Sequence, residues 1–127
     1  MVECKQVGYN REMPRTTEWV GFDLDGTLAH YDEWVDHVSI GEPVPRMVSL
    51  LKKYLARGME VRIFTARGTE WRPSDPRFKE TMNAIEIWCE HHIGQKLPIT
   101  SAKDLNCVAL YDDHAYGVIT NTGIVRL

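Results

Sequence analysis

Cysteine and long apolar runs are both scarce in this sequence, and each shortage excludes a class of protein. Only three cysteines occur among 127 residues. Cys4, Cys89 and Cys107 are odd in number and lack metal-ligand spacing, so they predict reduced thiols rather than a set of disulfides. No apolar run approaches the roughly 18 residues of a membrane helix, and residues 1–18 lack the apolar centre of a signal peptide. We therefore expect a cytoplasmic protein with no membrane partner.

Charge of one sign is not in large excess either. Fifteen basic residues face 18 acidic ones, which gives a net charge of −3. This balance argues against a surface that binds nucleic acid generally, while a local basic patch stays compatible with it. A hydrophobic content of 43% and 127 residues suit one globular domain with a continuous core. Residues 1–16 are polar and interrupted by Gly8 and Pro14, so we expect a leader followed by a single domain at 17–127.

Apolar runs and helical periodicities alternate along the chain. Short apolar runs predict strands at 19–22, 59–65, 96–100 and 107–113, the last of them buried, and short edge strands at 115–120 and 123–127. Between them, apolar residues spaced for one helical face predict helices within 41–58 and 77–92. Prolines begin the first helix and Gly58 ends it, and Ser74 or Asp75 can cap the second. The alternation predicts an α/β fold, a three-layer Rossmann-like sandwich with a mostly parallel central sheet.

Polar residues gather where the predicted strands end. In a parallel sheet the functional crevice lies beyond the carboxyl ends of the strands. This rule directs four carboxylates, one hydroxyl, one guanidinium and one ammonium group to one rim of the sheet. They belong to Asp23, Asp25, Thr65, Arg67, Lys103, Asp112 and Asp113. Several carboxylates with few histidines suit a hard cation such as Mg²⁺, and a hydroxyl with a lysine suits phosphate oxygens. A carboxylate can also attack phosphorus and form an aspartyl-phosphate, with a second carboxylate as general acid and base.

Four short motifs carry a resemblance to a known family. The segments "FDLDGTL", "IFTAR", "TSAKD" and "LYDDHA" occur in this order. Together they resemble the four motifs of the haloacid dehalogenase-like phosphohydrolases, in particular small members found in phages and prophages. The inserts after Leu28 and Gly68 are too short for a cap domain, so the resemblance implies a capless member. Similar proteins often have arginine where this chain has His114.

The resemblance implies a role for each matching residue. Asp23 corresponds to the nucleophile and a metal ligand, and Asp25 to the general acid and base, whose backbone carbonyl also binds the metal. Thr65 and Lys103 correspond to the phosphate-binding pair. Asp113 corresponds to the direct Mg²⁺ ligand, with Asp112 as a second ligand or beside it. Dehalogenating members lack the second aspartate, so the family reading is a Mg²⁺-dependent phosphatase.

Several alternatives remain at this point. A phosphotransferase shares the same intermediate, and a catalytically idle phosphate-binding module shares the same fold. A receiver domain is disfavoured, because its phosphorylated aspartate follows the third strand. An open, capless site suits nucleotides or polynucleotide ends as phosphorylated substrates, and a small phosphoester nearly as well; the oligomeric state is not predicted. Arg67, His30 and Trp71 are candidate substrate contacts, and Arg67 is alternatively a residue that orients a carboxylate of the site.

Overall fold

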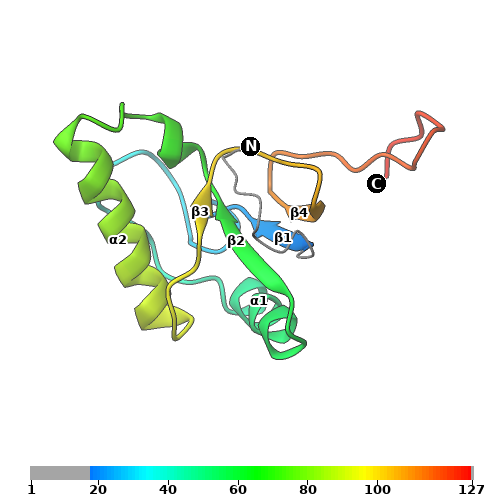
Figure 1. Cartoon of the computed structure of the whole chain (residues 1–127), viewed down its shortest axis with the longest axis horizontal. Helices are drawn as coiled ribbons and strands as arrows, with labels where there is room; N and C mark the ends of the chain where they lie inside the picture. The colour runs from blue at the N-terminus through cyan, green and yellow to red at the C-terminus, as the bar shows by residue number, and fades with distance from the viewer. Residues whose placement is uncertain (1–17, 127) are drawn as a thin grey trace, which may run out of the picture.

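The chain forms one parallel sheet with helices between its strands (Figure 1). A computed structural model describes residues 18–126, so the expected leader at 1–16 lies outside the described residues. The elements, in chain order, are β1 (Trp19–Phe22), α1 (Pro45–Ala56), β2 (Glu60–Phe64), η1 (Ala66–Thr69), α2 (Pro76–His92), β3 (Ile99–Thr100) and β4 (Cys107–Tyr111). Among these helices, none is long and apolar enough to cross a membrane.

The order of strands fixes where a site can form. The sheet runs β3-β2-β1-β4, and all three neighbouring pairs are parallel. The chain therefore builds outward from β1 through β2 to β3, and then returns to place β4 on the other side of β1. Such a reversal creates a crevice at the carboxyl ends of the two strands that flank it. Here those strands are β1 and β4, which end immediately before the acidic motifs.

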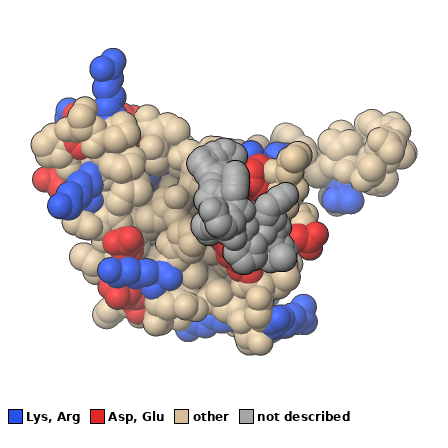
Figure 2. All heavy atoms as spheres, in the orientation of Figure 1, with Lys and Arg blue, Asp and Glu red and all other residues tan. Residues whose placement is uncertain are grey.

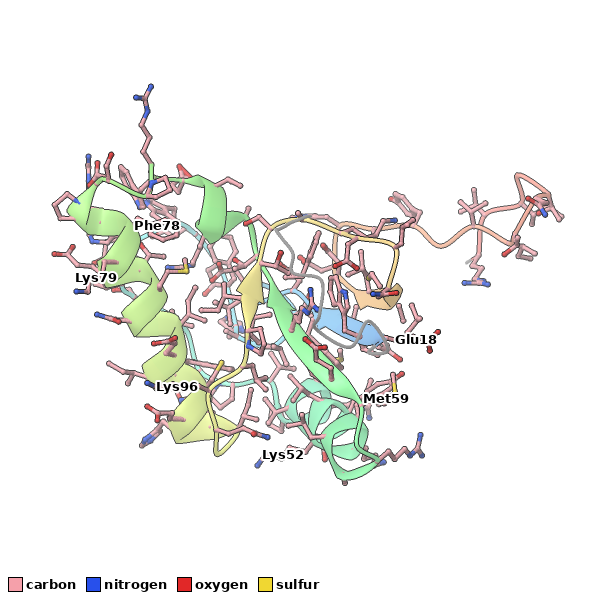
Figure 3. All side chains as sticks on the ribbon, in the orientation of Figure 1. Glu18, Lys52, Met59, Phe78, Lys79 and Lys96 are labelled. Atoms are coloured by element: carbon pink, nitrogen blue, oxygen red, sulfur yellow. The ribbon has the colours of Figure 1, made fainter. Side chains whose placement is uncertain are left out.

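Both helices cover the same face of the sheet. One buried cluster joins the sheet to both helices. It contains Val20 and Phe22 of β1, Val61 and Ile63 of β2, Val48 and Leu51 of α1, and Ile85, Trp88 and Cys89 of α2. Right-handed crossovers that proceed in one direction along a sheet place their helices on one side, which accounts for this arrangement. On the outer surface of α2, Lys79 is exposed and points away from the sheet (Figure 3). Basic and acidic side chains are intermixed over the face shown in Figure 2.

The ends of the helices follow the sequence signals. Pro45 stands in the first turn of α1, where its missing N–H costs nothing, and Gly58 follows the helix with a φ of 81°. Asp75 caps α2 by accepting a hydrogen bond from the backbone N–H of Arg77. The two predicted helices are therefore confirmed.

The opposite face of the sheet is closed by side chains in the described part of the chain. Trp19 is fully buried; its indole N–H donates to Asp104 Oδ1 over 2.8 Å, and the Arg62 guanidinium carbon lies 4.4 Å from its ring centroid. Residues 18–126 supply no helix to this face. The α/β class and the parallel sheet are confirmed, whereas the third layer of the expected sandwich is not present in this part of the chain.

Two further expectations about the last third of the chain are wrong. The fourth strand is not buried, because β4 is an edge of the sheet, ends at Tyr111 and leaves Val108 half exposed. The segments 115–120 and 123–126 form no strands, and only an isolated bridge joins Val118 to Val125. Asn121 and Gly123 take positive φ values of 64° and 74°, so the chain turns back on itself after a few residues. This segment extends away from the sheet (Figure 1), and Leu127 lies outside the described residues.

Candidate active site

The carboxyl ends of β1, β2 and β4 bring four of the predicted residues to one rim. Asp23 directly follows β1, and its backbone N–H donates to the carbonyl of Tyr111 at the end of β4 over 2.9 Å. Asp112 and Asp113 continue from β4, and Thr65 continues from β2. Because β1 lies between β2 and β4, the carboxylate of Asp23 stands between the hydroxyl and the acidic pair.

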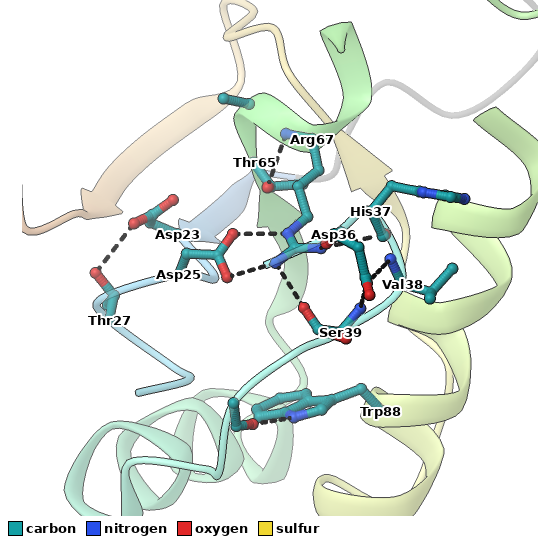
Figure 4. A network of polar contacts seen from close by, with 12 residues as sticks. Asp23, Asp25, Thr27, Asp36, His37, Val38, Ser39, Thr65, Arg67 and Trp88 are labelled. Atoms are coloured by element: carbon teal, nitrogen blue, oxygen red, sulfur yellow. Dashed lines mark hydrogen bonds and ion pairs between the residues drawn. The ribbon is translucent and has the colours of Figure 1, made fainter. Parts of the chain in front are cut away.

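Thr27 joins the two acidic motifs. Its hydroxyl oxygen lies 3.3 Å from Asp23 Oδ2 and 3.4 Å from Asp113 Oδ1, and it accepts the backbone N–H of Asp113 over 3.1 Å. Figure 4 shows the contact between Thr27 and Asp23. Ionised carboxylates only accept hydrogen bonds, so the one hydroxyl proton can serve only one of the two aspartates at a time. The two carboxylates are therefore close together and incompletely compensated.

The turn after β1 needs glycine at position 26. Gly26 has a φ of 89°, which side chains rarely tolerate, and a Cβ atom there would lie 2.5 Å from Asp113 Oδ2. The absence of a side chain lets the carboxylate of Asp113 approach the backbone of the first motif. The sequence "DGT" thus supplies both the sharp turn and the hydroxyl of Thr27.

The pKa of Asp23 is raised from its ordinary value of 3.8 to about 7. Burial is the largest cause, followed by the hydrogen bond with Asp113 and by the negative charges of Asp112 and Asp113. The backbone N–H of Leu24 acts in the opposite direction by favouring the charged form. A positive charge that joins the cluster would lower this pKa and favour the ionised carboxylate.

The donor atoms fit a hard divalent cation. Asp112, Asp113 and His114 offer one ligand atom each within 4.8 Å of one another. The carboxylates of this group, with Asp23 nearby, are the oxygen ligands that Mg²⁺ prefers, whereas the imidazole of His114 is exposed and lies 3.8 Å from Asp113 Oδ2. Asp112 Oδ1 also accepts the backbone N–H of His114 over 2.8 Å, which orients this carboxylate.

Asp25 points to a different partner. Arg67 donates from Nε to Asp25 Oδ2 over 2.8 Å and from Nη2 to Asp25 Oδ1 over 3.0 Å (Figure 4). Arg67 is 5% exposed and the Asp25 side chain 20% exposed, so this is a largely buried, bidentate ion pair. The contact matches the alternative that Arg67 orients a carboxylate of the site.

The same guanidinium fixes the loop at 30–44. Arg67 Nη1 donates to the carbonyls of Asp36 and His37 over 3.4 and 3.2 Å, and Nη2 donates to the carbonyl of Ser39 over 2.8 Å. The indole N–H of Trp88 donates to the carbonyl of Gly41 over 2.9 Å and holds the far end of the loop. Arg67 therefore ties the loop after the first motif to the carboxylate of Asp25.

No hydrogen bond joins Thr65 and Lys103, the predicted phosphate-binding pair, among residues 18–126. Thr65 is buried and its hydroxyl oxygen accepts the backbone N–H of Arg67 over 3.1 Å, which leaves the hydroxyl proton free to donate. Lys103 is exposed, and among residues 18–126 it forms no hydrogen bond or ion pair with the aspartates of the rim. Burial raises the pKa of the Cys107 thiol at the start of β4, and the positive charge of Lys103 acts in the opposite direction. The chain turns back toward β4 directly after the two residues of β3. At this turn, the hydroxyl of Ser101 donates to the backbone carbonyl of Thr65 over 2.7 Å.

The two remaining candidates lie on the periphery. His30 is exposed and its Nε2 lies 3.1 Å from Asp32 Oδ1. Trp71 packs between His37, at a ring-centroid distance of 5.8 Å, and Arg77, whose guanidinium carbon lies 3.9 Å from its centroid. Sequence reasoning missed Thr27 and Ser101; for Thr27, its place in the "DGT" of the first motif was the available signal.

Comparisons with known proteins add no assignment: neither a family model nor a curated protein matches the chain.

Proposed function

We propose that the protein is a Mg²⁺-dependent phosphatase that acts through an aspartyl-phosphate on Asp23. The observation that carries this proposal is the acidic cluster in the crevice between β1 and β4, where Thr27 contacts both Asp23 and Asp113 and where burial, followed by Asp113 and Asp112, raises the pKa of Asp23. A cluster of this kind is costly without a cation, which supports a divalent ion as part of the working site. The four motifs that resemble the haloacid dehalogenase-like phosphohydrolases point to the same chemistry.

The residues divide the reaction into two displacements. An oxygen of Asp23 bonds to phosphorus while the bond from phosphorus to the ester oxygen breaks, and the departing alcohol takes a proton from Asp25. Water then attacks phosphorus, gives its proton to Asp25 and releases phosphate, which regenerates Asp23. The hydroxyl of Thr65 donates to a phosphoryl oxygen. Asp23, Asp112 and Asp113 would hold Mg²⁺, which when bound supplies positive charge beside the phosphoryl group.

Asp25 needs a change of partner to act as an acid. Both of its oxygens accept hydrogen bonds from Arg67, and a protonated carboxyl has to give up one of them. Arg67 can lose one such bond at limited cost, because Nη2 also donates to the carbonyl of Ser39. We therefore assign Arg67 as a positioning residue that orients Asp25 and the loop together.

Phosphate release tests this proposal. The purified chain is assayed on nucleotides, sugar phosphates, and oligonucleotides phosphorylated at the 3′ or 5′ end, with Mg²⁺ and then with a chelator. Turnover that requires Mg²⁺ and disappears in Asp23→Asn is expected, while Glu90→Gln, an exposed change on α2, retains it. Absence of turnover from folded protein that binds Mg²⁺ would favour the alternative of an idle phosphate-binding module. Transfer of the phosphoryl group to an added alcohol in preference to water would identify a phosphotransferase.

A further inference from the structure

The loop at 30–44 presents apolar side chains to solvent although its backbone is firmly held. Tyr31, Val35 and Val38 are exposed, and 47% of Trp34 is exposed. Hydrogen bonds from Arg67 and Trp88 fix the carbonyls of this loop, and Asp36 Oδ1 accepts the backbone N–H groups of Val38 and Ser39 over 3.0 and 2.7 Å. Apolar groups that a fixed loop keeps in water are typical of a binding surface.

Trp34 lies one side chain away from Asp25. The centroid of its ring is 5.0 Å from the guanidinium carbon of Arg67, and Arg67 donates to both oxygens of Asp25. The cation stabilises the ring from one side, and the residue as a whole is 47% exposed. An organic group that extends from Asp25 past Arg67 therefore comes to the exposed part of Trp34.

The chemistry of the reaction decides which part of the substrate comes to this side. This step rests on the proposed function. A proton donor has to reach the oxygen that leaves phosphorus, so the alcohol part of the ester lies next to Asp25 once the phosphoryl group stands at Asp23. Asp25 is bound to Arg67 and, through it, to the loop at 30–44. The alcohol part of the substrate is thus directed toward Trp34.

We propose that Trp34 is a specificity residue that stacks on the base of a nucleotide, and that the substrate is a nucleoside phosphate, either free or at the end of an oligonucleotide. An exposed indole is the best available surface for a flat, unsaturated ring, and Val35 and Val38 extend the apolar surface of the loop. Tyr31 of the same loop is also exposed, and its ring is smaller than the indole. The ring of Trp71 is already covered by Arg77 and His37.

The test compares esters with and without a base in wild type and in matched variants. Adenosine 5′-monophosphate is expected to have a KM about 5- to 150-fold below that of ribose 5-phosphate, the range that corresponds to one stacked base. Trp34→Leu should remove this difference, and Trp34→Phe should retain most of it. Tyr116→Leu, an exposed aromatic residue in the C-terminal segment, serves as the control that leaves the ratio unchanged.

Calorimetric binding separates this inference from the proposed function. Adenosine 5′-monophosphate is titrated into Asp23→Asn with and without Trp34→Leu, and affinity should fall by the same factor as the KM ratio. Turnover with equal KM for both esters overturns the inference and leaves the phosphatase assignment intact. If no ester is hydrolysed, binding that depends on Trp34 still supports the base site, and binding that is independent of it overturns the site. Terminally phosphorylated oligonucleotides of the same base distinguish a free nucleotide from a chain end.

Discussion

Replacement of Asp23 by asparagine is expected to make the metal-free protein more resistant to rising pH. The pKa of Asp23 is raised from 3.8 to about 7, mainly by burial and then by Asp113 and Asp112, which follow β4. An acid whose pKa is raised on folding stabilises the folded chain while it is protonated. That contribution is complete below pH 3.8 and is lost as the pH rises through about 7. Asparagine keeps the shape and has no proton to lose.

The size of the effect follows from the shift. The change from 3.8 to about 7 corresponds to about 4 kcal/mol at 1.36 kcal/mol per pKa unit. Asp23 is only partly buried, so solvent screening reduces this to about 2 kcal/mol. Part of the loss occurs below pH 5. The free energy of unfolding of Asp23→Asn relative to wild type should therefore rise by ~1 to 1.5 kcal/mol from pH 5 to pH 8.

Urea unfolding at a series of pH values, in the presence of a chelator, measures this difference directly. Glu90→Gln is the control, because its side chain is exposed on α2 and should give a difference that does not change with pH. At pH 8, addition of Mg²⁺ should make the wild type more stable than Asp23→Asn, because the ion stabilises the folded protein with ionised Asp23. A difference between Asp23→Asn and wild type that is flat across this range, or that shrinks as the pH rises, would refute the electrostatic account of the cluster.

Three further predictions test the surroundings of the cluster. Arg67→Met should lower the free energy of unfolding by about 2–3 kcal/mol in urea titrations, because it leaves the largely buried carboxylate of Asp25 without its partner. Asp25→Asn should cost clearly less, and equal costs would show that the ion pair is not the cause. Gly26→Ala should lower the free energy of unfolding by about 1–2 kcal/mol, because alanine is strained in the left-handed backbone conformation. It should also reduce the rise in melting temperature that Mg²⁺ causes, since the new Cβ displaces Asp113. An unchanged rise would contradict the close approach of Asp113 to Gly26. Burial, and to a smaller extent the charge of Glu86, raises the pKa of the Cys89 thiol to about 12. Iodoacetamide should therefore modify Cys107 well before Cys89, as followed by peptide mass spectrometry. The reverse order would be inconsistent with the burial of Cys89 on α2.

The positions of the strand ends could be predicted because two simple rules apply to them. Apolar runs mark the strands, and parallel strands bring their carboxyl ends to one edge. This was enough to place Asp23, Asp112 and Asp113 together. The sequence does not decide between the two roles of Arg67, because its position alone does not tell whether the guanidinium faces a substrate or a carboxylate of the site. The structure answers this through the carbonyls of the loop at 30–44.

Other features depend on tertiary packing that no local pattern records. The run at 107–111 is apolar enough for a buried strand, but the order of the sheet makes it an edge. Residues 115–126 have the composition of edge strands, yet an early turn at Asn121 leaves them as one isolated bridge.

The most direct test of the central claim is to identify the residue that receives the phosphoryl group. The chain is mixed with Mg²⁺ and a reactive phosphate monoester, quenched in acid within its turnover time, digested and analysed by mass spectrometry. The account predicts one phosphoryl group on Asp23, none in Asp23→Asn, and its loss when the chelator is added before the ester. Mg²⁺-dependent release of phosphate with the phosphoryl group on another residue, or on none, would contradict it.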